Sequence, residues 1–233
     1  MGNAVTFSCS ALAGANKAGN LKKNERGYYP IVVGALDMYN SAGQLYVYEE
    51  AKELFQSSSQ FMRRVAKGVL RGELGHPKPQ PGQSMEQFAQ RVLSIYEENT
   101  ICHHKSITLD FDNVKDERGN PVIAIISEVC PSGPHGAALE RSLNNPDENV
   151  CFSIRAFTDD YRVGGITKRV LKTIVTFDYV NEGGIIVAQK YKSPALESEF
   201  QHQFSRGVIE RGAAQAASAG TAMESTRMNV NEL

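Results

Sequence analysis

His76, Ser153 and Asp178 are three residues whose side-chain types could together provide a nucleophile, a base that activates it and an acid that orients the base. A serine hydroxyl is a poor nucleophile at neutral pH and needs a neighbouring base to take its proton. A histidine titrates near neutrality, so it can take that proton and later return it to the leaving group. A carboxylate on the second ring nitrogen fixes the tautomer and stabilises the protonated ring. Such triads occur in several unrelated chain orders, so the order His, Ser, Asp is compatible with this chemistry.

The local sequence around each residue suits such a role. His76 precedes a proline, which biases its backbone away from the helical region and towards a strand end or turn. Glu73, three residues earlier, could hydrogen-bond the imidazole. Ser153 and Asp178 lie in runs rich in β-branched and aromatic residues, which favour strands. Successive side chains of a strand face opposite sides, so Cys151 shares the face of Ser153.

Other residues could take over parts of this site. Cys151 with His76 could form a thiol dyad, and His103 or His104 could replace the acid as the third member. The non-catalytic interpretation is that the serine lies on a solvated strand face and that the histidine is a loop residue without a functional role. Adjacent histidines on a strand point to opposite faces and cannot easily share an ion, so we expect neither a metal nor a cofactor.

Composition limits the classes of protein. A chain of 233 residues with 41% hydrophobic and 22% charged residues is typical of a globular protein. Its net charge of −1 provides no broad positive field, which argues against nucleic acid as a partner. The four cysteines contain no C-x-x-C pair, which favours a reducing compartment. No apolar run approaches the ~18 residues of a membrane span, and no secretory signal is evident.

Hydrophobic periodicity and turn signals predict the elements that must position the three residues. Ser84 with Gln87 three positions later forms a capping box that predicts the start of a helix. We expect helices over 46–56, 84–98, 136–143 and 196–211. We expect strands over 5–9, 61–73, 101–114, 122–129, 150–157, 169–180 and 185–188. Because no βαβ rhythm is present, the pattern favours an α+β fold with a mostly antiparallel sheet or barrel and peripheral helices.

Four local patterns resemble the prohead (capsid maturation) serine proteases of tailed phages, of the myovirus type, which are distantly similar to herpesvirus assemblins. Lys23–Pro30 resembles their N-terminal Asn-x-x-Gly-x-x-Tyr/Pro segment, and Gly72–Pro77 resembles the G-E-L-x-H-P box that holds the catalytic histidine. Phe152–Ala156 resembles the V-S-x-R-G box that holds the nucleophile, with Ala156 in place of the usual glycine. Phe177–Val180 is similar to a later F-D-I-V box that would supply the acid.

The resemblance implies a serine endopeptidase with His76, Ser153 and Asp178 as its triad. It implies a β-barrel-like, herpesvirus-protease-like core, which we place at 27–192. Composition predicts a weakly ordered arm over 1–26 and a helical or flexible tail over 193–233. The enzyme would act on capsid and scaffold proteins inside the assembling procapsid, in the host bacterial cytoplasm, as a possible homodimer. The alternative is a non-enzymatic scaffold or core protein of the procapsid.

The same family implies cleavage after Glu in small-x-Glu motifs. Glu197 and Glu224 end such motifs in the expected tail and are candidate self-cleavage sites, whereas Glu140 lies in an expected helix. A pocket for a glutamate carboxylate needs a cation. The candidates are Arg155, which shares the face of Ser153, and Arg162, Lys168 and Arg169. Backbone N–H groups near Gly164-Gly165 or Gly183-Gly184 would serve a developing oxyanion.

Overall fold

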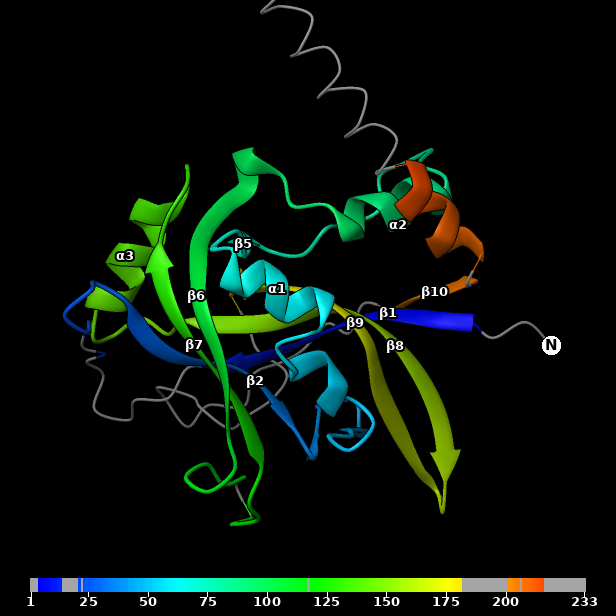
Figure 1. Cartoon of the computed structure of the whole chain (residues 1–233), viewed down its shortest axis with the longest axis horizontal. Helices are drawn as coiled ribbons and strands as arrows, with labels where there is room; N and C mark the ends of the chain where they lie inside the picture. The colour runs from blue at the N-terminus through cyan, green and yellow to red at the C-terminus, as the bar shows by residue number, and fades with distance from the viewer. Residues whose placement is uncertain are drawn as a thin grey trace, which may run out of the picture.

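Two β-sheets and the helices around them make up the described chain in this computed structural model (Figure 1). The structure describes residues 4–13, 21, 23–116, 118–181, 201–205 and 207–215, and only the backbone of 4–13 and 201–205. The six-stranded sheet has the order β10 (Gln201–Ser205), β1 (Ala4–Ala13), β8 (Cys151–Val163), β9 (Ile166–Val180), β4 (Gln44–Tyr46) and β3 (Met38–Tyr39). The four-stranded sheet has the order β2 (Tyr29–Leu36), β7 (Ile123–Pro131), β6 (Thr100–Asp110) and β5 (Arg71–Glu73).

Helices lie outside these sheets, so the α+β prediction is confirmed. They are α1 (Gln60–Ala66), α2 (Met85–Leu93), α3 (Gly136–Asn144), the 3-10 turns Lys52–Phe55 and Glu97–Asn99, and a helix over 207–215. Strand neighbours pair antiparallel except β4 with β9. In the described part of the chain the strands form two separate sheets and no closed barrel, which corrects the expected barrel-like core. None of the described helices is long and apolar enough to cross a membrane.

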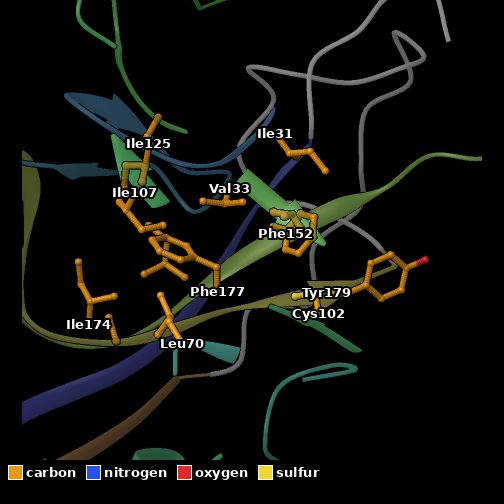
Figure 2. Packing of buried hydrophobic residues seen from close by; sticks show 14 of the residues in the cluster. Ile31, Val33, Leu70, Cys102, Ile107, Ile125, Phe152, Ile174, Phe177 and Tyr179 are labelled. Carbon is orange, nitrogen blue, oxygen red and sulfur yellow. The ribbon is translucent and has the colours of Figure 1, made fainter. Parts of the chain in front are cut away.

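The main hydrophobic core lies between the two sheets, where Figure 2 shows Phe152, Phe177 and Val33 close together. A second, smaller cluster holds α2 in place. Phe88 and Val92 of α2 pack there with residues of β8 and β9, and Val208 and Ile209 of the helix over 207–215 cover it. The core therefore anchors the β8–β9 hairpin from one side, and the smaller cluster ties α2 and the C-terminal helix to the same hairpin.

Local signals explain where the predictions succeeded and where they failed. The Ser84–Gln87 capping box is present, although α2 ends at Leu93 and not near residue 98. The helix expected over 46–56 is only the short 3-10 turn Lys52–Phe55. The strand expected over 61–73 is wrong in its first half, because α1 begins there with Ser59 as its N-cap. Phe61 and Val65 bury the same face of α1 at helical spacing.

Both expected terminal segments contribute strands. β1, which contains the expected strand over 5–9, lies in the sheet between β10 and β8. Where a helix was expected over 196–211, the structure has β10 and then the helix over 207–215. Gly212 of that helix is buried against α2, where an added Cβ would lie 3.3 Å from the Glu86 carbonyl oxygen. The strand expected over 185–188 lies outside the described residues.

Candidate active site

The β8–β9 hairpin places Ser153 and Asp178 directly opposite each other on neighbouring strands. Residues in such a pair project to the same face of a sheet. The alternate residues Phe152, Ile154 and Phe177 enter the hydrophobic core. The serine and the acid therefore share the face of the hairpin that turns away from the core.

A short loop after β5 brings His76 to the same carboxylate. Leu74 forms a parallel bridge with Tyr179, and the Gly75 N–H donates to the Tyr179 carbonyl at 2.7 Å. Gly75 has φ of +77°, which glycine adopts without the steric cost of a side chain. The turn leaves Nδ1 of His76 2.9 Å from Oδ2 of Asp178. An ionised carboxylate at Nδ1 keeps the proton on that nitrogen and leaves Nε2 as the basic atom.

Asp178 is completely buried, yet it is held as a carboxylate by several donors. Its Oδ1 accepts from the Glu73 backbone N–H at 2.9 Å and from Nη2 of Arg155 at 2.7 Å. Its Oδ2 accepts from Nε of Arg155 at 2.7 Å as well as facing His76. Burial opposes its ionisation, but the Arg155 charge and the His76 hydrogen bond outweigh burial and hold the pKa of Asp178 well below its usual range.

Arg155 occupies a different position from the one expected for a substrate-binding cation. It is completely buried and forms a bidentate ion pair with Asp178. Its Nη1 donates to the Ser94 carbonyl at 2.9 Å. Its Nη2 also lies 3.0 Å from Oε2 of Glu73. Burial disfavours the charged guanidinium, but these carboxylates prevail and raise the pKa of Arg155. In this geometry Arg155 binds the acid of the site and presents no free face to a substrate carboxylate.

Glu73 is a further member of the site, and its role differs from the hydrogen bond to the imidazole that its spacing suggested. Its Oε1 accepts from the Tyr96 N–H at 2.5 Å and from Nη1 of Arg91 at 3.1 Å. Its Oε2 accepts from Nη2 of Arg91 at 2.6 Å and faces Arg155. Arg91 comes from α2, and its guanidinium stacks 3.9 Å from the centre of the Tyr96 ring. Nothing in the local sequence marks Arg91, because its partner is 18 residues away in the chain.

A cavity of about 460 Å³ opens beside His76. Its wall includes Leu74, His76, Lys78, Gln80, Arg91 and Tyr96. Leu74 and Tyr96 are exposed apolar side chains, whereas Lys78 brings an exposed charge. Ser153 itself is only 1% exposed.

His103 and His104 of β6 form hydrogen bonds with other parts of the fold. His104 is buried, with Nδ1 2.9 Å from Oγ of Ser127 and Nε2 2.9 Å from the Phe177 carbonyl oxygen. Burial lowers the pKa of His104 to about 4, so it is neutral at physiological pH. His103 faces the Tyr28 hydroxyl and the Gly68 carbonyl. Of the three candidates for the third member, Asp178 is the one whose side chain contacts His76.

The remaining candidates lie in less favourable positions. Cys151 is buried opposite Val180, one alternation along β8 from Ser153. Arg169 forms a bidentate ion pair with Asp160. Arg162, Lys168 and the Gly164-Gly165 turn are at the far end of the hairpin, about 30 Å along the strand from Ser153. Gly183-Gly184, Glu197 and Glu224 lie outside the described residues.

The close approach of β5 to β9 depends on Gly72. A Cβ at this position would lie 2.4 Å from the Phe177 carbonyl oxygen and 2.7 Å from Sγ of Cys102. We expect Gly72→Ala to push the two strands apart, costing about 1–3 kcal/mol in the free energy of unfolding. The displaced loop should misplace His76 and reduce any hydrolytic rate by as much as ~100-fold. Denaturant unfolding and a peptide-cleavage assay would measure the two effects.

Gly43→Ala is the control for the Gly72 variant. It adds the same methyl group to the β3–β4 turn, where nothing lies within 4 Å. Because Gly43 has φ of +74°, the substitution should cost about 1 kcal/mol through backbone strain and leave activity unchanged. Equal activity in both variants would contradict the proposed dependence of the site on the β5–β9 approach.

Comparisons with known proteins agree with the motifs. The model of the peptidase S80 family matches residues 7–233. A protein of Pseudomonas phage phiKZ described as a capsid maturation protease is 38% identical over 200 residues, which cover 84% of this chain and 73% of the relative. The capsid assembly protease of bacteriophage T4 aligns in structure with a TM-score of 0.44 and 12% identity, over 79% of this chain and 97% of that one. The family match and the phiKZ relative confirm the expected likeness to capsid maturation proteases of phages.

Proposed function

Because the chain belongs to the peptidase S80 family, we propose that it is a serine endopeptidase with Ser153 as nucleophile, His76 as general base and Asp178 as the acid that orients the base. One observation carries this proposal. The carboxylate of Asp178 contacts Nδ1 of His76 at 2.9 Å and lies directly opposite Ser153 on the neighbouring strand. The proposal therefore assigns all three roles to side chains that converge on one face of the β8–β9 hairpin.

The geometry supports a two-step acyl transfer. Oγ of Ser153 attacks the peptide carbonyl while Nε2 of His76 takes its proton. Asp178, kept ionised by its donors, stabilises the imidazolium that forms. His76 then protonates the leaving amine, which departs and leaves an acyl-serine. A water molecule, deprotonated by the same imidazole, attacks that ester, and the imidazolium returns the proton to Oγ of Ser153 as the acid product leaves. Backbone N–H groups are the expected donors to the oxyanion.

The proposed substrates are the capsid and scaffold proteins of a phage procapsid. The phiKZ relative supports this assignment through its description as a capsid maturation protease. The site of action is then the interior of the procapsid, and a homodimer is the proposed assembly. Cys151 is less suited as a nucleophile, because it lies opposite Val180 and not opposite the acid that contacts His76.

Cleavage after Glu in small-x-Glu motifs, including self-cleavage, is part of the proposal. We expect a peptide that contains Ala-Leu-Glu to be cut at least ~10-fold faster than its Gln analogue, because a pocket built for a charged group rejects an analogue that leaves that group unpaired. Mass spectrometry of the peptide products would measure the ratio. Equal rates for the two peptides would contradict the proposed specificity.

Self-cleavage has two candidate positions with different consequences. A cut after Glu197 would separate β10 and the helix over 207–215 from the rest of the chain, whereas a cut after Glu224 would leave both attached. The first should destabilise α2, whose Phe88 and Val92 pack with Val208 and Ile209. Intact mass over time, beside Ser153→Ala, would identify the position. Glu140 is an internal control, because it lies in α3 and should stay uncut.

A further inference from the structure

Five side chains with alternating charge form one connected row that ends at His76. Asp178 follows His76 at 2.9 Å, and Arg155 follows Asp178 at 2.7 Å. Glu73 lies 3.0 Å from Arg155, and Arg91 lies 2.6 Å from Glu73. Asp178, Arg155 and Glu73 are essentially buried, and the side chain of Arg91 is 14% exposed. Charges so poorly hydrated act on one another strongly.

The row compensates for the positive charge of Arg155. Its guanidinium is permanently charged and binds both oxygens of the carboxylate that contacts His76. An uncompensated cation there would offset the carboxylate and make it harder for the imidazole to take a proton. Glu73 places a second negative charge 3.0 Å from Nη2 of Arg155, the nitrogen that also binds Oδ1 of Asp178, and Arg91 in turn holds the Glu73 carboxylate from α2.

We propose that Glu73 and Arg91 are positioning residues that set the proton affinity of His76 through Arg155 and Asp178. This inference rests on the proposed function and deepens it, because it assigns the tuning of the general base to residues on β5 and α2. In this arrangement Glu73 keeps the Asp178 carboxylate available to the imidazolium. Arg91 holds the Glu73 carboxylate in place and partly offsets its negative charge.

Other charged or titratable groups close to this row do not replace it. Cys102 and His104 of β6 both face Asp178, and burial keeps both neutral by raising the pKa of the thiol and lowering that of the imidazole. Arg64 of α1 donates to the Val175 carbonyl and faces Arg155. The two guanidinium groups carry the same charge and repel each other. Lys78, on the loop of His76, is exposed in the cavity wall and therefore screened by solvent.

Two charge-removing variants test the inference because their expected signs are opposite. Glu73→Gln removes a negative charge and should shift the acid limb of the pH profile of kcat/KM to lower pH, by roughly half a unit or more. Arg91→Gln removes the cation that offsets the negative charge of Glu73, and it should shift the acid limb to higher pH by a smaller amount. The pH profile of the double variant should lie nearer that of the wild type. A merely structural role, in which either change loosens the site, would move both single variants in the same direction.

An NMR titration of the His76 imidazole in a Ser153→Ala background gives the same information without any activity. The opposite shifts should appear there too, so failure of the proposed function (no hydrolysis by the wild type) stays distinguishable from failure of this inference. Glu128→Gln is the control, since it removes a carboxylate that pairs with Lys105 between β6 and β7 and should shift neither curve. Shifts of the same sign, or none, in both Glu73→Gln and Arg91→Gln would overturn the inference. If Glu73→Gln fails to fold, an Arg91→Gln shift to lower pH, or no shift, overturns it.

Discussion

Replacing Ser153 with alanine is expected to lower peptide cleavage by at least about three powers of ten, because nucleophile and base act as one unit and neither works alone. The fold should survive, since the change removes one oxygen from a strand whose opposite face remains packed in the core. The measurements are kcat/KM on a small-x-Glu peptide, labelling by a serine-directed fluorophosphonate, and thermal unfolding.

Two further variants decide between the nucleophiles. His76→Ala should match Ser153→Ala in rate, whereas Cys151→Ala should retain activity. Retained proteolysis in Ser153→Ala together with loss in Cys151→Ala would transfer the nucleophile to the thiol. A wild type that neither cleaves nor reacts with the fluorophosphonate would favour the non-enzymatic scaffold protein.

The convergence of His76 with Asp178 was predictable because each local signal was short-range. Pro77 and Gly75 fix a turn at the histidine, and a period of two determines which side chains share a strand face. The same reasoning failed for Arg155. Its spacing placed it correctly on the face of Ser153, but the atoms that engage its guanidinium come from β9, β5 and the segment after α2.

The failed prediction of a strand over 61–73 has a similar cause. Phe61, Val65 and Val69 recur every fourth residue, which fits one face of a strand as well as one face of a helix. The decisive signal was the N-cap at Ser59, whose Oγ accepts from the Met62 N–H. Local capping chemistry there outweighs β propensity. The open arrangement of the two sheets was equally hidden, because it depends on which strands pair across long stretches of chain, such as β1 with β10.

Asp178→Asn is expected to reduce both the rate and the stability, because this carboxylate orients the base and neutralises a buried cation. An amide on Nδ1 no longer fixes the imidazole tautomer, which should cost about four powers of ten in kcat. It also leaves Arg155 with one buried counter-charge, Glu73, in place of two. Breaking a buried ion pair by removing one partner costs about 3–5 kcal/mol. Steady-state kinetics and denaturant unfolding would measure the two losses.

A matched control separates the two roles. Asp160→Asn breaks the other buried arginine fork of the hairpin, between Asp160 and Arg169, at a distance from His76. It should lower stability and leave kcat unchanged. The double variant Asp178→Asn/Arg155→Met also removes the buried cation that has lost this counter-charge. It should regain part of the stability without regaining the rate. A double variant that recovered the rate would show that Asp178 acts only by balancing Arg155, and the acid of the triad would have to lie elsewhere.

The pH dependence of unfolding gives an independent check on the same carboxylate. The pKa of Asp178 is depressed in the folded protein, chiefly because the Arg155 charge outweighs the cost of burial. A group of this kind contributes stability above its unfolded pKa of about 4, and that contribution is lost as pH falls towards the folded pKa. The wild type should therefore lose stability steadily below about pH 5, whereas Asp178→Asn should show a shallower slope over that range. Parallel slopes in the two proteins would mean that Asp178 is not the ionised partner of His76 and Arg155.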